Sequence, residues 1–250
     1  MKNGHRRPYL DEIISTNEDK MIMVDSLERF IEVQLHEWGH RDGKPKAERA
    51  GPVIAITREP GSRGEIIAKK IAEEFGLVLY DWKIVEEIAK DSHVSERVVA
   101  TLEENFRSEL DDFLEGFSAK PGLSAHQYMQ SLRKILFTVA THGNAVILGR
   151  GASFLLPQER RTLGLRFVAP LEVRVKNTMQ ALKLSHESAL KEVTRTEKEQ
   201  SQWVRTNCAA RIDDASNYHM VINTALVTSD KVLQIVRSIL EEQNAHAGIS

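Results

Sequence analysis

The sequence has little of several features that mark particular classes of protein. It has one cysteine, Cys208, which excludes an intramolecular disulfide framework and a cysteine-based zinc cluster. Its apolar runs are only as long as strands, and the N-terminus lacks the apolar stretch of a signal peptide. We therefore expect a cytoplasmic protein that does not enter a membrane.

An excess of charge of one sign is also missing. The chain has 34 Lys and Arg against 36 Asp and Glu, a formal net charge of -2. Nucleic-acid partners usually require a clear basic excess, so we expect none, and any basic site must be local. The nine histidines are scattered without the spacing of a metal-ligand motif, and we assign no metal site to the chain.

The first 50 residues are predicted to be an extension that precedes a main domain at 51–245. A helix is expected there, because Asp25 and Ser26 can cap it and five apolar residues share one face: Leu27, Phe30, Ile31, Leu35 and Trp38. The stretch 41–51 has the glycine, proline and charge content of a linker. Two partners for the apolar face remain open, the main domain or a second copy in a homodimer.

From Pro52 onward, short apolar strands alternate with longer amphipathic stretches, which is typical of βαβ units and a parallel sheet. Strands are expected at 53–56, 77–80, 145–148, 165–168 and 221–223, and helices at 66–75, 129–141, 171–182 and 231–242. The Glu-rich stretch at about 91–127 predicts further helices outside the sheet's layers. They form either an acceptor-binding excursion or a solvated insertion.

The segment after the first strand carries the strongest chemical signal. Strand 53–56, the turn Arg58-Glu59-Pro60-Gly61-Ser62-Arg63-Gly64 and a helix form a cradle that favours phosphate oxygens, although ordinary βα turns also use glycine. Alignment with G-x-x-x-x-G-K-[ST] puts Gly64 at the lysine and Glu65 and Ile66 at the hydroxyl residue. Both signature groups are missing. Arg58 and Arg63 can replace the lost charge, because a guanidinium binds phosphate well.

Two further candidates follow predicted strands. Arg150 lies between Gly149 and Gly151 just past strand 145–148, and is either a phosphate ligand or a surface arginine. Asp81 ends the second strand, where it can face an acceptor, cap the next helix, or do both.

A basic stretch near the C-terminal third is the last candidate. Four residues recur at i, i+3, i+7 and i+10 along one helix face: Arg195, Lys198, Gln202 and Arg205. They form either a phosphate-closing lid or a solvated face balanced by neighbouring glutamates. Arg211, with Asp213 and Asp214, is a second cluster suited to phosphate or magnesium.

Four blocks of the sequence resemble the cytidylate kinase-like family, in the right order over roughly residues 52–240. TREPGSRGEIIAKKIAEEFGLVLYD is similar to the first βαβ segment of that family, whose members also lack the usual lysine. VILGRGASFLLP resembles the segment in which a Gly-Arg pair contacts the acceptor phosphate. RFVAPLEVRV and MVINTALVTSDKVLQIV resemble the later strands with their helices.

The resemblance implies an α/β fold of three layers, the P-loop nucleoside monophosphate kinase-like fold, with a five-stranded parallel sheet and helices on both faces. It implies transfer of a phosphoryl group from ATP, with Mg2+ supplied mainly through the nucleotide, to a nucleoside monophosphate, CMP or dCMP. It also implies the site. The donor phosphates would contact Arg58, Gly61, Ser62, Arg63 and Gly64, and the acceptor would contact Asp81 and Arg150. A lid at about 190–216 would contribute Arg195, Lys198, Arg205 and Arg211.

Catalysis is implied for Arg63, Arg150, Arg195 and Arg205, but the lid departs from the family pattern. Relatives show an acid followed three residues later by arginine, whereas this chain has Gln200 three residues after Glu197. Each missing cation weakens transition-state stabilisation. Two alternatives therefore stay open: a catalytically weak or inactive nucleotide-binding regulator, and a kinase for a different small acceptor.

Overall fold

The computed structural model describes residues 29–38, 51–102, 104–115, 123–156 and 162–247. The chain divides into two compact units, Met1–Gly43 and Lys44–Ser250. In the first unit, residues 29–38 form a helix whose least exposed side chains are Ile31, Gln34 and Trp38. The expected cap at Asp25 and Ser26, with Leu27 and nearly all of the linker 41–51, lies outside the described residues. The homodimer contact stays a prediction.

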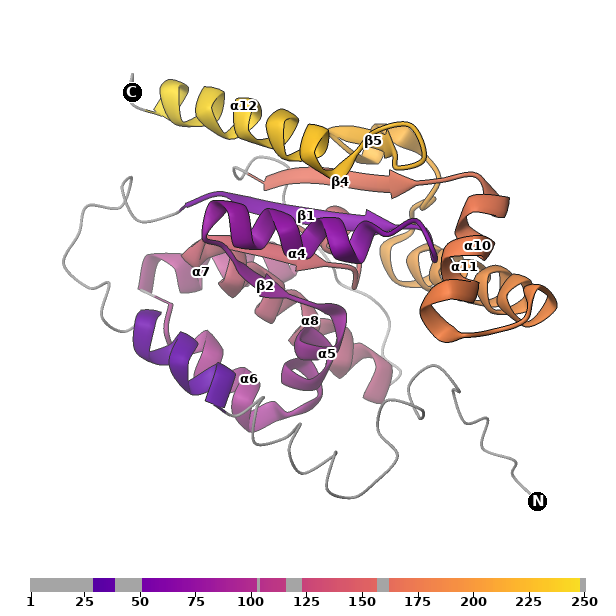
Figure 1. The fold of residues 1–250 in the computed structure, drawn as a ribbon. Helices are drawn as coiled ribbons and strands as arrows, with labels where there is room; N and C mark the ends of the chain where they lie inside the picture. The colour runs from indigo at the N-terminus through magenta and orange to yellow at the C-terminus, as the bar shows by residue number, and fades with distance from the viewer. Residues whose placement is uncertain (1–28, 39–50, 103, 116–122, 157–161, 248–250) are drawn as a thin grey trace, which may run out of the picture. The chain divides into compact units, whose positions relative to one another are not determined.

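The second unit contains the five-stranded, all-parallel sheet that the sequence predicts (Figure 1). Its strand order is β2-β3-β1-β4-β5. The strands are β1 (Val53–Arg58), β2 (Val78–Tyr80), β3 (Ala145–Leu148), β4 (Thr162–Val168) and β5 (Met220–Asn223). β1 and β3 are apolar on both faces and almost wholly buried, as strands covered on two sides must be.

The register of the sheet brings several chain segments to one edge. Ile56 of β1 pairs with Leu148 of β3 on one side and with Leu165 of β4 on the other. Because all strands run in the same direction, the segments that follow β1, β3 and β4 emerge side by side. This edge is where ligands of open parallel sheets bind.

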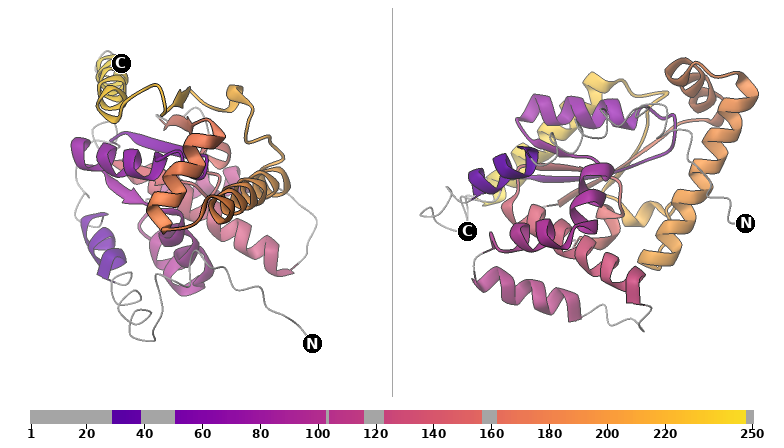
Figure 2. Two further views of the ribbon diagram at one scale, coloured as in Figure 1. Left: turned by 45° about the vertical axis from the view of Figure 1, so that its right-hand side comes forward. Right: turned by 90° about the horizontal axis from the view of Figure 1, so that it is seen from below.

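Helices cover both faces of the sheet (Figure 2). α4 (Gly64–Phe75) and α12 (Ser229–Ala247) lie on one face and enclose the main hydrophobic core, which includes Ile54, Ile56 and Phe167. α8 (Leu123–His142) and α9 (Ala152–Leu155) cover the other face, where Ser153 approaches Thr57 of β1. The three layers follow from strands that are apolar on both sides.

Three shorter helices pack against α8: α5 (Trp82–Lys90), α6 (Ser92–Val99) and α7 (Glu104–Glu115). α7 buries Leu110 in a separate small core with Phe137 of α8, and the ring of Phe113 lies 5.4 Å from that of Phe137. The described residues of the Glu-rich stretch thus include the helices α6 and α7 and the start of α8. Its acceptor-binding role stays a prediction.

α10 (Leu171–Leu182) and α11 (His186–Cys208) pack on each other beyond the ends toward which the β1 and β4 arrows point (Figure 1). The 3-10 turn η1 (Ala215–Asn217) then leads to β5. Across the described ranges, no helix combines the length and hydropathy needed to cross a membrane. The cytoplasmic location stays a prediction.

Candidate functional site

Side chains from other segments hold the loop between β1 and α4 by hydrogen bonds to its carbonyl groups. Asn177 donates to the carbonyl of Gly61 at 2.8 Å, and Thr224 donates to the carbonyl of Ser62 at 2.7 Å. Since the peptide group is planar and trans, the N–H of Arg63 points away from Thr224. Gly61 has φ 78°, and a side chain there would place Cβ 2.4 Å from the carbonyl oxygen of Arg174. The glycine is therefore required by close packing on α10.

Glu59 ties this loop to the junction between β4 and α10. Its carboxylate accepts a hydrogen bond from the backbone N–H of Ala169 at 3.0 Å and lies 3.3 Å from Arg174 and 3.6 Å from Arg166. Both arginine side chains are only 7% exposed. The carboxylate thus compensates two buried cations and fixes the start of the loop.

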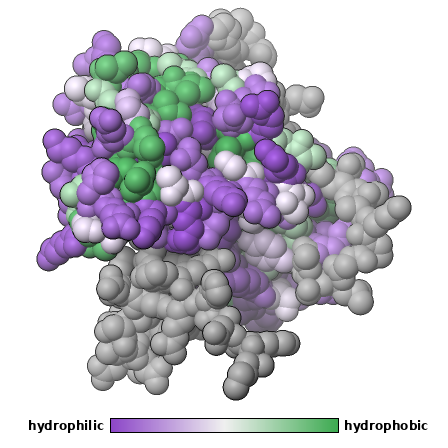
Figure 3. All heavy atoms as spheres, turned by 90° about the vertical axis from the view of Figure 1, so that its right-hand side faces the viewer, coloured by the Kyte–Doolittle hydropathy of each residue, from purple (hydrophilic) through white to green (hydrophobic). Residues whose placement is uncertain are grey.

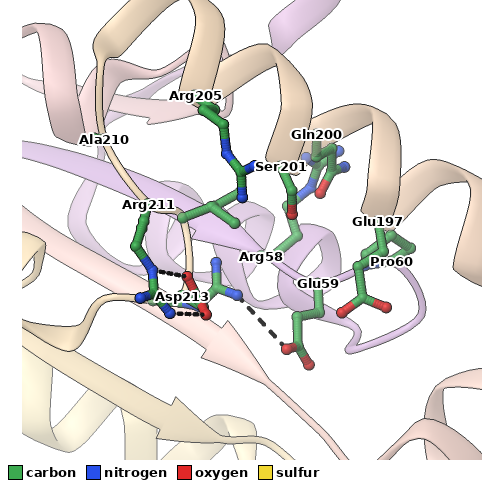
Figure 4. A pocket seen from close by; sticks show the side chains of 12 residues that line it. Arg58, Glu59, Pro60, Glu197, Gln200, Ser201, Arg205, Ala210, Arg211 and Asp213 are labelled. Atoms are coloured by element: carbon green, nitrogen blue, oxygen red, sulfur yellow. Dashed lines mark hydrogen bonds and ion pairs between the residues drawn. The ribbon is translucent and has the colours of Figure 1, made fainter.

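A pocket of about 210 Å³ opens beside this loop, between the carboxyl ends of β1 and β4, α11 and the segment that follows α11. Four arginines and three acids line it: Arg58, Arg166, Arg205, Arg211, Glu59, Glu197 and Asp213. Figure 4 shows Arg58, Arg205 and Arg211 entering from three different segments. Arginines outnumber acids in this lining, a composition that favours an anion over a cation.

Two of the pocket's buried donors lack a hydrogen-bond partner within the described part of the chain. They are Nε of Arg58 and Nη1 of Arg166. Arg58 is otherwise held by Glu65, whose carboxylate accepts from its Nη2 at 2.7 Å. The Arg166 guanidinium lies 5.7 Å from the ring of Tyr218. Because buried charged donors without acceptors are costly, these two atoms point to a bound anion.

The acids of the pocket are all engaged by arginines. Arg174 lies 3.2 Å from Glu197, and Arg211 lies 2.9 Å from Asp213. The Arg211 hydrogen bond lowers the pKa of Asp213. In the part of the chain that the structure describes, no group of three or more His, Cys, Asp or Glu side chains is arranged to hold a metal ion. The pocket's residues therefore do not fit a magnesium ion held by the protein itself.

α11 presents a different face to the pocket from the one predicted. Its pocket-lining residues are Glu197, Gln200, Ser201 and Arg205. Of the predicted set, Arg205 lies in the pocket, whereas Lys198 and Gln202 are exposed outside it. Arg195 also lies outside, with ion pairs to Glu192 at 2.6 Å and to Glu199 at 2.8 Å. Helical spacing finds residues that share a face, but not the side on which a ligand pocket lies.

The other predicted phosphate ligands of the loop are placed as follows. Ser62 is fully buried, and Gly64 is buried at the first position of α4. Arg63 has φ 63° at the N-cap of α4, and its side chain is exposed outside the pocket lining. Of these loop residues, Arg58 alone lines the pocket. The donor-phosphate role of the others stays a prediction.

Arg150 lies at a second site on the same sheet edge. It has φ 48° directly after β3, and its guanidinium forms an ion pair with Glu86 of α5. The guanidinium carbon lies 5.0 Å from the ring of Trp82 and 6.0 Å from that of Trp203 on α11. Gly149 separates the two sites, since a Cβ there would be 3.4 Å from Trp82 and 3.6 Å from Arg58.

Asp81 caps α5, one of the two roles considered for it. Its carboxylate accepts from the backbone N–H groups of Lys83 at 2.8 Å and Ile84 at 3.1 Å. This satisfies two of the free N–H groups at the helix start. Its contact with an acceptor stays a prediction.

Sequence reasoning missed Arg166, Glu59 and Glu197 as parts of the pocket. A signal for Arg166 was present, because a charged residue within an otherwise apolar strand is seldom buried unless it is paired or functional. Glu197 was considered as a balancing surface charge and as the acid of the family's lid pattern, but not as part of a pocket. The face that carries α10 and α11 is mainly hydrophilic, with scattered hydrophobic side chains (Figure 3), which suits a charged, water-soluble ligand.

The chain is similar to known proteins over about three quarters of its length. The model of the cytidylate kinase-like family matches residues 53–226, which include both sites. The cytidylate kinase of Ignicoccus hospitalis is 26% identical over 190 residues, 75% of this chain and 98% of that protein. The cytidylate kinase of Methanocaldococcus jannaschii is 26% identical over 192 residues, 76% of this chain and 97% of that protein.

A solved structure shares the fold. An uncharacterized protein from Eubacterium ventriosum superimposes with a TM-score of 0.58 at 20% identity, covering 76% of this chain and 98% of its own. Together with the sheet topology, these similarities show the α/β, three-layer, P-loop kinase-like fold that the sequence predicted.

Proposed function

The chain belongs to the cytidylate kinase-like family, and we propose that it transfers the γ-phosphoryl group of ATP to a nucleoside monophosphate. CMP and dCMP are the proposed acceptors, because the similar proteins from Ignicoccus hospitalis and Methanocaldococcus jannaschii are cytidylate kinases. A kinase for a different small acceptor would follow the same proposal with another second substrate.

One observation carries the proposal: four arginines from four segments converge on one pocket beside the β1–α4 loop. Phosphoryl transfer depends on positioning and on cations around the oxygens of the transferred group. Arg58 takes over the charge of the missing lysine, and its carboxylate partner Glu65 keeps the guanidinium at the loop. Arg205 of α11 supplies a cation from the opposite side, as a lid residue would.

The reaction needs no strong general base. An oxygen of the acceptor's phosphate already carries the electron pair that forms the new bond to the γ-phosphorus. The bond between that phosphorus and the bridging oxygen breaks, and ADP leaves with the electron pair. The proposed contribution of this chain is to hold the two phosphates, neutralise charge with Arg58, Arg166 and Arg205, and exclude water beneath α11.

Magnesium enters this proposal only with the nucleotide. The carboxylates of the pocket, Glu59, Glu197 and Asp213, are paired with arginines and offer no ready coordination shell. Magnesium bound to ATP supplies charge neutralisation on the phosphate oxygens. In this proposal the arginines of the pocket are the cations that contact the phosphates.

A second candidate function is a nucleotide-binding regulator with weak or no turnover. It is favoured by Gln200, which lines the pocket at the position where the family resemblance implies an arginine. In addition, Glu65 occupies the position at which the P-loop pattern has a Ser or Thr hydroxyl that binds magnesium. In this alternative the pocket still binds a polyphosphate.

The proposal is tested by ADP release with ATP, magnesium and a panel of CMP, dCMP, UMP, AMP and GMP. Binding of a nonhydrolysable ATP analogue is measured in parallel by calorimetry. Arg58→Met should lower turnover about a hundredfold, because it removes a charge-assisted contact to the phosphates. Arg237→Met is the matched control, since Arg237 lies on α12 outside the pocket lining and pairs with Glu74.

The outcomes separate the candidates. Turnover that depends on a monophosphate and falls in Arg58→Met, but not in Arg237→Met, supports the kinase. Binding of the ATP analogue without turnover for any acceptor supports the regulator. Absence of both binding and turnover contradicts both functions.

A further inference from the structure

Arg150, the cation that the family resemblance assigns to the acceptor phosphate, is already neutralised within the protein. Arg150 pairs with Glu86, and each of these two side chains is only 16% exposed. Trp82 and Trp203 lie against the guanidinium at 5.0 and 6.0 Å, within cation–π range. A phosphate that binds Arg150 must therefore compete with a carboxylate for the same guanidinium.

Glu86 is placed so that it can lose Arg150 without becoming an isolated charge. Its second carboxylate oxygen, Oε1, lies 3.1 Å from Nζ of Lys90, one turn later on α5. If Arg150 turned to another anion, the Lys90 pair would remain. The cost of releasing Arg150 is thereby limited, because an unpaired carboxylate in a half-buried position is avoided.

Two hydrogen-bond donors at the Arg150–Glu86 pair have no acceptor in the described structure. The hydroxyl of Tyr128 and Nε of Arg150 are buried, and neither has a hydrogen-bond partner in the described ranges. Burial raises the pKa of Tyr128, and the charges of Arg150, Glu86 and Lys90 act on the same hydroxyl. Tyr128 is thus a neutral donor close to the pair. A carboxylate with two oxygens leaves these donors unmatched, whereas a phosphate offers three oxygens.

We propose that Glu86 is an internal competitor that occupies the position of the acceptor's phosphate at Arg150, and that a phosphate monoester dianion binds by displacing it. This inference rests on the proposed function in placing the acceptor at Arg150. Because the competitor carries one negative charge, a dianion is favoured over it and a monoanion is not. Glu86 therefore selects for acceptors with a doubly charged phosphate.

Glu86→Gln tests the proposal, because glutamine keeps the size and one acceptor oxygen but removes the charge. The matched control is Glu87→Gln on the same helix, since Glu87 pairs with Lys90 at 3.3 Å and is 56% exposed. Intrinsic tryptophan fluorescence reports binding at Trp82 and Trp203. The ligands are inorganic phosphate and CMP, at an ionic strength held constant with chloride. We expect Glu86→Gln to bind both about tenfold more tightly than the unaltered protein, and Glu87→Gln to bind like it.

Further variants locate the signal and control for folding. Arg150→Met, alone and combined with Glu86→Gln, should give two proteins of equal affinity for each ligand, because Glu86 then has no guanidinium to occupy. Glu86→Asp retains the charge but shortens its reach, and should tighten phosphate binding less than Glu86→Gln does. Melting temperatures of all variants identify any change that comes from lost folding.

Equal or weaker phosphate binding by folded Glu86→Gln would show that Glu86 positions Arg150, and the inference would be wrong. A tightening by Glu86→Gln that persists in the Arg150→Met protein would also overturn it, because Glu86 would then act on an anion bound elsewhere. Failure of the proposed function looks different: no monophosphate would support turnover, while Glu86→Gln would still bind inorganic phosphate more tightly than the unaltered protein.

Discussion

The two candidate sites lie on the same edge of the sheet and treat their arginines in opposite ways. The arginine pocket gathers four guanidinium groups and leaves buried donors of Arg58 and Arg166 without partners. The second site holds one arginine, Arg150, paired with Glu86 and placed against two tryptophans. The arginines of the first site also have carboxylate partners, but they outnumber the acids that line the pocket, so an anion can bind there without displacing a group of the protein. The second is charge-compensated, so its ligand must displace a group of the protein.

α11 connects the two sites and makes their difference testable. Arg205 and Gln200 of this helix face the arginine pocket, whereas Trp203 lies beside Arg150 and packs against Gly151. A helix that supplies groups to both sites can move in response to either ligand. Four predictions follow from this comparison.

The largest expected effect concerns Cys208, which ends α11 beside Gly151. The reactivity of its thiol tests whether water is excluded near the Arg150 site. Burial raises the pKa of this thiol to about 12. A raised pKa keeps the thiol neutral, so at pH 8 its modification should be on the order of a thousandfold slower than that of a thiol with pKa 8.5. The rate should rise steadily with pH from 7 to 10, as measured with a chromogenic disulfide. A plateau near pH 8.5 would contradict the burial, and urea-unfolded protein is the control.

Arg205→Ala is expected to lower turnover about a hundredfold, because it removes a cation from the arginine pocket. Arg195→Ala is its matched control on the same helix, since Arg195 pairs only with Glu192 and Glu199 in the described structure. That change should alter turnover less than about threefold and helix stability by about 0.5 kcal/mol. Steady-state kinetics with both variants checks this. Equal losses would return the lid role to the face that the sequence predicted.

Gly151→Ala should destabilise the protein by about 2–3 kcal/mol, because φ is 70° there and the new Cβ would lie 2.8 Å from the ring of Trp203. Gly76→Ala, with φ 62° and no atom within 4 Å of its Cβ, isolates the backbone cost at about 1 kcal/mol. Thermal unfolding measures both variants. If the two melting temperatures fall equally, the ring of Trp203 does not pack closely against Gly151 in solution.

Gln200→Arg has the smallest expected effect, a gain in turnover of about tenfold. It supplies an arginine where the family resemblance implies one, within the pocket that Gln200 lines. Gln202→Arg is the control, because Gln202 is exposed outside the pocket. The coupled ADP-release assay measures both. No gain in Gln200→Arg, with ATP-analogue binding unchanged, would favour the regulatory function.

Much of the fold followed from the sequence, because burial on both faces leaves a strong local pattern. Strand limits differ from the predicted ones by at most three residues, with the largest difference at the start of β4. There Thr162 and Gly164 interrupt the apolar run, yet both pair with β1. The loop from Arg58 to Gly64 was also found, since glycine and a following helix mark it.

The assignment of charged residues to sites was less complete, for a physical reason. Periodicity groups Arg195, Lys198, Gln202 and Arg205 on one face of α11, but the direction of that face depends on how the helix packs. The same applies to Arg150, whose partner Glu86 is 64 residues away in the chain.

By itself the sequence determined the order of strands and helices along the chain, the place of the glycine-containing loop between β1 and α4 and the resemblance to the family, all of which are local patterns. The tertiary structure alone decided which arginines share a pocket, that Glu59 holds Arg166 and Arg174, and that Arg150 is neutralised by Glu86. Pairing of charges is set by distance in space between segments far apart along the chain, and no local pattern encodes that distance.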